Sequence, residues 1–274
     1  MIEVSVDGAT VTVPSAATIL EACRAMGSEV PSLCYLETLT PVNACRVCVV
    51  EVEGSRPLVP ACSRTVEEGM VISTSSDRVA VSRRLVFELL ASSVDLSLVD
   101  DQTRRWMDEA GVDPGRFGSE ARTVEHDVKV QDDLYIRDYD KCILCYKCVE
   151  ACGEDAQNSF AISISGRGFT AEVSTEFDVA LPNSACVYCG NCVGVCPTGA
   201  LIGKVEYDMR RDGSWDTSRQ TVTRTVCTFC GVGCNLDVHV QDNAIVNVTS
   251  PIDHSVTSGH LCIKGRFGWS HVQT

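Results

Sequence analysis

The chain has 274 residues, with 23 Lys or Arg against 37 Asp or Glu, which gives a formal charge of −14. This acidic balance argues against a nucleic-acid partner, because such partners require a basic surface. No stretch approaches the roughly 20 apolar residues of a membrane span, and the first residues lack the pattern of a secretory signal. The 17 cysteines therefore indicate metal binding in a reducing cytoplasm rather than a disulfide framework.

The N-terminal segment predicts a small domain of strands and one helix. VSVDGATVTV alternates and turns at Asp7-Gly8, which predicts a β-hairpin. SAATILEACRAMG then predicts a helix, with Ser15 as its N-cap and Gly27 as its C′ residue. MVISTSS, at 70–76, predicts a closing strand. A hairpin, a helix, a cysteine-bearing loop and a closing strand together favour a β-grasp domain.

The first of four cysteine sets lies in this domain. It has the pattern C-x10-C-x2-C-x13-C and consists of Cys34, Cys45, Cys48 and Cys62. Four thiolates from a loop and a later return can enclose a [2Fe-2S] cluster. With TILEACRAMGSEVPSLCY ahead of it, the segment resembles plant-type ferredoxins and the related N-terminal domains of complex I and iron-only hydrogenase subunits. Cys23 is the remaining cysteine; it shares a helix face with Ile19 and Met26, so we expect it in the core and not as a ligand.

The segment that follows predicts a helical spacer. Helices are expected from about Asp77 and from about Asp101, separated by a turn. The stretch 85–113 contains no Cys and no His. His126 lies further on without cysteines near it, and we expect a surface histidine.

Two cysteine runs then share the pattern C-x2-C-x2-C-x3-C, which is the signature of bacterial two-cluster ferredoxins. In that motif the fourth cysteine of each run binds the other cluster. One [4Fe-4S] cluster is therefore expected on Cys142, Cys145, Cys148 and Cys196, and the other on Cys186, Cys189, Cys192 and Cys152. Proline follows only the second run, as Pro197, while Gly153 follows the first. Structural zinc is the alternative, but zinc sites use two C-x2-C pairs across a spacer and not four cysteines within eleven residues.

The fourth set is C-x2-C-x3-C-x27-C, made of Cys227, Cys230, Cys234 and Cys262. LDVHVQDNAIVNVTS fills the spacer and predicts two short strands that turn at Asp242-Asn243. With LCIKGRFGW, the arrangement resembles the N-terminal [4Fe-4S] domain of molybdenum or tungsten bis-pterin oxidoreductases such as formate dehydrogenases. That resemblance implies that Lys264 lies between cluster and pterin; an exposed surface Lys is the alternative. We expect Phe267 and Trp269 to be exposed and, with the residues from about Gly259 to Thr274, to pack on a partner.

Taken in order, the four sets resemble the N-terminal iron–sulfur half of the α-subunit of NAD-dependent formate dehydrogenases and, more loosely, the large iron–sulfur subunit of complex I. In those relatives the segment after the two-iron domain carries a His and three Cys for a further cluster, which is absent here. No nucleotide-binding motif, flavin signature or positioned nucleophile is visible. We therefore expect a chain that carries electrons without a catalytic residue of its own, and that ends where a separately encoded pterin domain would begin.

These observations predict an α+β modular protein with one [2Fe-2S] and three [4Fe-4S] clusters. The expected domains are 1–78, a plant-type β-grasp; 79–135, the spacer; 136–215, a two-cluster ferredoxin; and 216–274, a molybdopterin-oxidoreductase-type cluster domain. The resemblance implies a cytoplasmic electron-transfer subunit between a flavin/NAD diaphorase subunit and a molybdenum or tungsten bis-pterin subunit. An NAD-linked hydrogenase or other reductase is the alternative complex, and a redox sensor or assembly scaffold is the alternative of another class.

Overall fold

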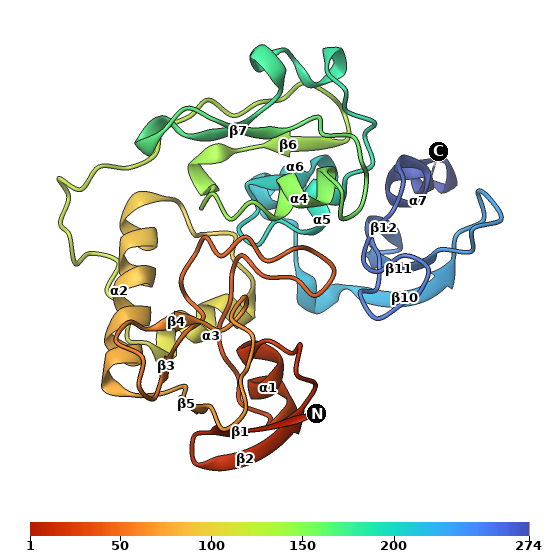
Figure 1. Cartoon of the computed structure of the whole chain (residues 1–274). Helices are drawn as coiled ribbons and strands as arrows, with labels where there is room; N and C mark the ends of the chain where they lie inside the picture. The colour runs from red at the N-terminus through yellow and green to blue at the C-terminus, as the bar shows by residue number, and fades with distance from the viewer. Residues whose placement is uncertain (274) are drawn as a thin grey trace. The chain divides into compact units, whose positions relative to one another are not determined.

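The computed structural model describes residues 1–273 (Figure 1). Its contacts divide the chain into two compact units, one made of Met1–Tyr35 with Pro41–Val124, the other of Leu36–Thr40 with the chain from Glu125 onward. Every helix within residues 1–273 is too short or too polar to cross a bilayer. The short 3-10 helices all lie in the second unit, at Tyr139–Lys141, Gly168–Thr170, Glu176–Asp178, Leu181–Asn183, Thr217–Arg219 and Gly268–Val272.

A mixed five-stranded sheet forms the base of the first unit, in the order β2-β1-β5-β3-β4. Strands β1 and β5 are parallel, and the other neighbours are antiparallel. The predicted hairpin is confirmed, because Asp7 and Gly8 adopt φ of 49° and 85° between β1 and β2. The predicted closing strand is confirmed as β5, though it is shorter than expected. The bounds are β1 Ile2–Val6, β2 Ala9–Val13, β3 Val49–Val52, β4 Val59–Pro60 and β5 Val71–Ser73.

Helix α1 (Ile19–Ala25) lies on this sheet and begins later than the sequence suggested. Ser15 as N-cap is wrong, because Thr18 caps the helix: its side chain accepts from the Glu21 amide, and the Glu21 carboxylate accepts from the Thr18 amide at 2.6 Å. This capping box satisfies two orphan amides at once. Gly27 does follow the C-cap, with φ of 74°. Cys23 is fully buried in the core formed by α1 and the sheet, as predicted.

Two helices complete the first unit, α2 (Asp77–Ser93) and α3 (Asp101–Glu109). Both begin at the residues that the sequence predicts. The side chain of Ser76 accepts a hydrogen bond from Val79 N, and that of Asp100 accepts one from Thr103 N. These caps explain the starts, because each satisfies an amide of the first turn.

The second unit contains a ferredoxin-like part built around two short helices, α4 (Lys147–Cys152) and α5 (Asn191–Gly194), which contact each other. Strand β6 pairs with β9, and β7 pairs with β8. The remaining bounds are β6 Tyr135–Arg137, β7 Ser163–Ser165, β8 Glu172–Ser174, β9 Leu201–Gly203 and α6 Lys204–Asp212. Leu39 packs with Ala151 and Val195, and Thr40 donates its amide to Asp155 at 2.6 Å, which ties the segment 36–40 to this unit.

The C-terminal part of this unit is a three-stranded antiparallel sheet followed by α7 (Ile263–Phe267), all in blue in Figure 1. The two predicted strands are confirmed as β11 (Asn235–Gln241) and β12 (Ala244–Thr249), with positive φ at Asp242 and Asn243 in the turn. A third strand, β10 (Thr221–Val226), precedes them and was not predicted. Helix α7 contacts β12.

Candidate iron–sulfur sites

The structure brings the four cysteines of the first set together. The amide of Cys45 donates to Cys34 Sγ at 3.4 Å. Thiol hydrogen bonds from Cys45 and Cys62 lower the pKa of Cys34, and a thiol hydrogen bond from Cys62 lowers that of Cys48. These contacts bring all four sulfur atoms into one group. Their cysteines lie on the loop and the later segment that the sequence predicts.

Two cavities of the second unit contain the cysteines of the two runs. One cavity is lined by Cys142, Cys145, Cys148 and Cys196, together with apolar residues such as Ile143. Burial raises the pKa of Cys142 to about 11 and that of Cys145 to about 12, so binding of iron would displace protons from these thiols.

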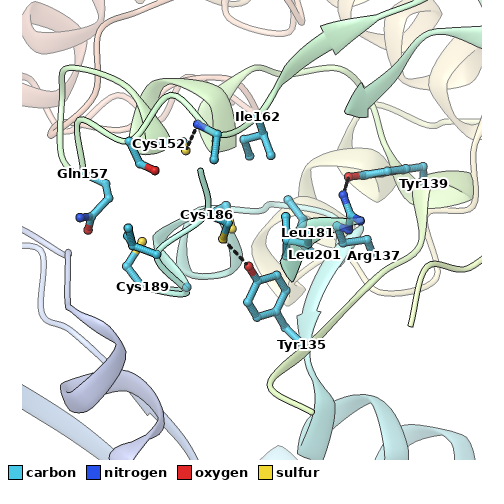
Figure 2. Close-up of a pocket in the computed structure, with 15 residues that line it drawn as sticks. Tyr135, Arg137, Tyr139, Cys152, Gln157, Ile162, Leu181, Cys186, Cys189 and Leu201 are labelled. Atoms are coloured by element: carbon cyan, nitrogen blue, oxygen red, sulfur yellow. Dashed lines mark hydrogen bonds between the residues drawn. The ribbon is translucent and has the colours of Figure 1, made fainter. Parts of the chain in front are cut away.

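The other cavity is lined by Cys152, Cys186, Cys189 and Cys192 (Figure 2). In each cavity, three cysteines of one run therefore meet the fourth cysteine of the other run. The hydroxyl of Tyr135 lies 3.3 Å from Cys186 Sγ. Burial raises the pKa of Tyr135, so its hydroxyl keeps its proton and can donate to a thiolate.

The two cavities are neighbours. Tyr139 and Leu201 line both of them, and both side chains are buried. The Tyr139 hydroxyl accepts a bond from Arg137 at 3.4 Å. Two redox groups bound in these cavities would thus be separated by little more than one layer of side chains.

The backbone around both runs is arranged alike. Leu144 and Tyr188, each two residues after the first cysteine of its run, have φ of 52° and 57°. Their amides donate to Cys142 Sγ and Cys186 Sγ, in both cases at 3.4 Å. The left-handed residue turns the chain so that an amide faces sulfur, and such hydrogen bonds stabilise thiolate charge.

The fourth set gathers beside the C-terminal sheet. The pKa of Cys234 is raised by burial first and then by its neighbours Cys227, Cys230 and Cys262, so all four lie within electrostatic reach. Cys227 is buried and its amide donates to the carbonyl of Cys234 at 2.8 Å. Cys230 and Cys262 are exposed. This site therefore opens to the surface, unlike the two cavities, and Lys264 is exposed beside it.

Two sequence expectations near these sites are wrong. Phe267 and Trp269 are not free aromatics: Phe267 stacks on Tyr135 at 6.1 Å between ring centroids, and Trp269 packs against the core of the C-terminal sheet and donates to the Arg266 carbonyl at 2.9 Å. Both rings are half-buried rather than exposed, because the fold offers each a matching face. Packing of the residues from about Gly259 to Thr274 on a partner stays a prediction.

His126 is not a surface histidine either. Its side chain is only 13% exposed, its Nδ1 lies 3.8 Å from Glu172 Oε2, and its ring packs edge-on against Tyr139. No cysteine of a ligand set is among these partners. His126 is thus packed against Glu172 and Tyr139 in the ferredoxin-like part.

The residues fit iron–sulfur clusters. Thiolates are the ligands such clusters require, and each of the two cavities offers four of them among apolar side chains with amides directed at sulfur. Among residues 1–273, no three His, Cys, Asp or Glu side chains converge on a site for a single ion. A cluster is larger than one ion, so its four cysteine ligands lie further apart than the ligands of a single ion do.

Three family models match the chain in the order of these sites. The 2Fe-2S iron-sulfur cluster binding domain matches residues 1–77, and the 4Fe-4S dicluster domain matches 124–200. The molybdopterin oxidoreductase Fe4S4 domain matches 220–274. The matches cover all four cysteine sets.

Similar proteins align with the whole of this chain or nearly so. The NADPH-Fe(3+) oxidoreductase subunit alpha of Geobacter sulfurreducens is 34% identical over 100% of this chain and 32% of its own length. An NADH-quinone oxidoreductase subunit of Rhizobium meliloti is 32% identical, with the same coverage. A putative formate dehydrogenase of Staphylococcus haemolyticus is 28% identical over 99% of this chain and 31% of its own length. The chain spans about a third of the length of the curated relatives it matches.

A solved structure shows the same fold. The crystal structure of NAD+-reducing [NiFe]-hydrogenase in the H2-reduced state superposes with a TM-score of 0.65 at 24% identity, covering 74% of this chain and 87% of that chain. The sequence-based resemblance is thereby confirmed, with domains for a 2Fe-2S cluster and for 4Fe-4S clusters on a mixed helix and strand fold. The chain is an iron–sulfur electron-transfer protein related to formate dehydrogenase-like proteins and to NADH-quinone oxidoreductase subunits.

Proposed function

We propose that the chain relays electrons, one at a time, within a cytoplasmic complex, through one [2Fe-2S] and three [4Fe-4S] clusters. A flavin/NAD diaphorase subunit meets the two-iron domain, and a molybdenum or tungsten bis-pterin subunit meets the C-terminal cluster. Formate dehydrogenase is the activity of the complex. The ligand sets are those named above, on domains 1–78, 136–215 and 216–274, with 79–135 as a spacer without a cluster.

The pair of neighbouring cavities carries this proposal. Each is lined by three cysteines of one run and the fourth of the other, and Tyr139 and Leu201 line both. This crossing is what two-cluster ferredoxins require. Two clusters held so close together suit electron relay better than sensing or cluster donation, which need an exposed and labile site.

The exposure of the C-terminal site supports a contact with a redox partner at this cluster. Cys230 and Cys262 reach the surface, and Lys264 lies two residues after Cys262 on the exposed side of α7. A redox partner can approach such a site closely. Bound there, the partner would find Lys264 able to stabilise negative charge as an electron passes.

A lysine substitution tests this. In the complete complex, Lys264→Ala should slow electron transfer to the catalytic subunit while the iron content stays unchanged. Arg211→Ala is the matched control, because its side chain is 72% exposed on α6, outside the cluster sites. Turnover of the Lys264→Ala complex at the wild-type rate would remove Lys264 from the electron path.

A second function is favoured by one observation, the fold shared with the NAD+-reducing [NiFe]-hydrogenase structure. In that case the relay serves a hydrogenase, and the C-terminal cluster lies off the electron path. Purification of the native complex distinguishes the two functions. A molybdenum or tungsten subunit supports the first, and a nickel subunit with hydrogen-dependent NAD reduction supports the second.

A further inference from the structure

One cation is buried against the second cavity. Arg266, on α7, is 4% exposed. Its Nε donates to the carbonyl of Cys189 at 3.2 Å, and its terminal nitrogen donates to Asn191 Oδ1 at 3.3 Å. The same Asn191 oxygen accepts the amide of Leu261 at 2.9 Å. A side chain of the C-terminal part thus ends inside the ferredoxin part of the same unit.

The charge of Arg266 has no carboxylate partner in the described part of the chain. Its two hydrogen bonds reach neutral oxygens, the carbonyl of Cys189 and Oδ1 of Asn191, and both residues belong to the run that supplies ligands to the second cavity. Guanidinium groups stay protonated in proteins. These neutral acceptors leave the positive charge itself uncompensated, and a cluster bound by the thiolates of the second cavity would offset the cost of burying it.

A comparison of the two runs shows that the second run is adapted to this side chain. At the position two residues after the second cysteine, the first run carries the buried Lys147 and the second run carries the neutral Asn191. Lys147 is buried at the start of α4, between Cys145 and Cys148 in the sequence, so the first run carries a cation of its own. The second cavity receives its cation from α7 instead.

Two glycines make room for Arg266. Tyr146 of the first run corresponds to Gly190 of the second, and both have positive φ, 66° and 71°. A Cβ on Gly190 would lie 2.3 Å from Arg266 Cδ, and one on Gly194 would lie 2.9 Å from its terminal nitrogen. A backbone of this shape tolerates a tyrosine in the first run, so glycine at 190 is explained by the approach of Arg266 and Phe267 and not by φ alone.

We propose that Arg266 is the buried countercharge of the cluster held by Cys152, Cys186, Cys189 and Cys192, and that it raises the reduction potential of this cluster. The inference rests on the ligand set given under the proposed function. Reduction adds one negative charge to a cluster, and a nearby cation stabilises the reduced form more than the oxidised form. The effect is strong where water is excluded.

The position of Arg266 also depends on the C-terminal site. Cys262, of the fourth cysteine set, is the N-cap of α7, and the amide of Arg266 donates to its carbonyl at 3.1 Å. The element that carries the C-terminal cluster therefore also sets the potential of the cluster before it.

Potentiometric titration followed by EPR tests the proposal on the full chain with its clusters. Arg266→Gln should shift one [4Fe-4S] transition to lower potential and leave the other transitions in place. Arg266→Lys, which keeps the charge, should stay close to the wild type. Asn191→Asp keeps the acceptor oxygen but places a carboxylate beside the guanidinium, and it should lower the same transition. Arg224→Gln is the control, since Arg224 is exposed and pairs with Asp237.

Tyr135→Phe identifies the transition, because it removes the hydroxyl at Cys186 Sγ and should also lower the potential of this cluster. An unchanged transition in a fully iron-loaded Arg266→Gln protein overturns the inference, as does an equal shift in Arg266→Lys. If Arg266→Gln loses iron, retention of iron in Arg266→Lys supports the countercharge role and loss in both overturns it. Failure of the ligand set is distinct, because the wild-type chain itself would then lack one [4Fe-4S] signal.

Discussion

The two ferredoxin cavities share one backbone design but obtain their positive charge from different places. In the first, Lys147 belongs to the run that supplies the ligands. In the second, Asn191 stands at that position and Arg266 enters from α7. Two copies of one motif can thus differ in their local charge. Here the difference comes from Asn191 in place of a lysine and from Arg266, which lies outside the run. The second cavity becomes sensitive to the C-terminal part, whereas the first does not.

The largest effect is expected from the crossed ligands. Cys152→Ala should remove the cluster of the second cavity, although Cys152 lies in the first run. Cys196→Ala should remove the cluster of the first cavity. Each variant should lose about four irons, and in the Cys152→Ala protein the transition sensitive to Tyr135→Phe should disappear. Loss of that transition in Cys196→Ala instead would reverse the assignment.

Removal of the positive charge beside the first cavity should have the next largest effect, on a cluster potential. Lys147→Met removes the buried cation that faces Cys145. One [4Fe-4S] transition should move to lower potential, and it should not be the one moved by Arg266→Gln. EPR-monitored titration measures both. Movement of the same transition in both variants would mean that the two cations act on one cluster and that the comparison is wrong.

Substitution of Cys23 tests whether this cysteine is a core residue or a cluster ligand. It is fully buried against the sheet, and burial raises its pKa to about 11, so it remains a neutral thiol. Cys23→Ser should leave all clusters intact and lower the free energy of unfolding by about 1–2 kcal/mol, the cost of a buried hydroxyl without a partner. Chemical denaturation of the variant measures this. Disappearance of the [2Fe-2S] EPR signal would show that the first ligand set was chosen wrongly.

The smallest effect concerns His239 on β11 of the C-terminal sheet. Burial lowers its pKa below 6.5, although Asp237 opposes the shift, and its Nε2 lies 3.0 Å from Thr249 Oγ1. The folded state therefore takes up a proton less readily than the unfolded state, and stability falls as pH drops below about 6.5. His239→Gln should make the melting temperature less dependent on pH between 7 and 5. An unchanged pH dependence would exclude His239 as its source.

Local signals in the sequence predicted much of the fold. Asp7-Gly8 marks a turn because these two residues adopt positive φ. Ser76 and Asp100 mark two helix starts because their side chains accept hydrogen bonds from amides three residues later. The same reasoning missed Thr18 as the cap of α1, although Glu21 three residues later completes the capping box. Strand β10 was missed, since all six of its residues are exposed and no apolar face marks it.

Contacts between distant segments could not be predicted in this way. Cys152 and Cys196 were assigned to opposite clusters through the ferredoxin motif, not from spacing alone. Nothing in KGRFGW indicates that Arg266 is buried beside Cys189, or that Phe267 stacks on Tyr135. Those contacts exist only once α7 and α5 meet. The glycines at 190 and 194 were the one available signal, visible when the two runs are compared position by position.

The four cysteine sets are expected to hold four clusters. A determination of iron, acid-labile sulfide and zinc on the anaerobically purified chain tests it most directly. We expect about fourteen irons per chain, from one [2Fe-2S] and three [4Fe-4S] clusters, with little zinc. A metal content dominated by zinc, or about ten irons or fewer after full reconstitution, would contradict it.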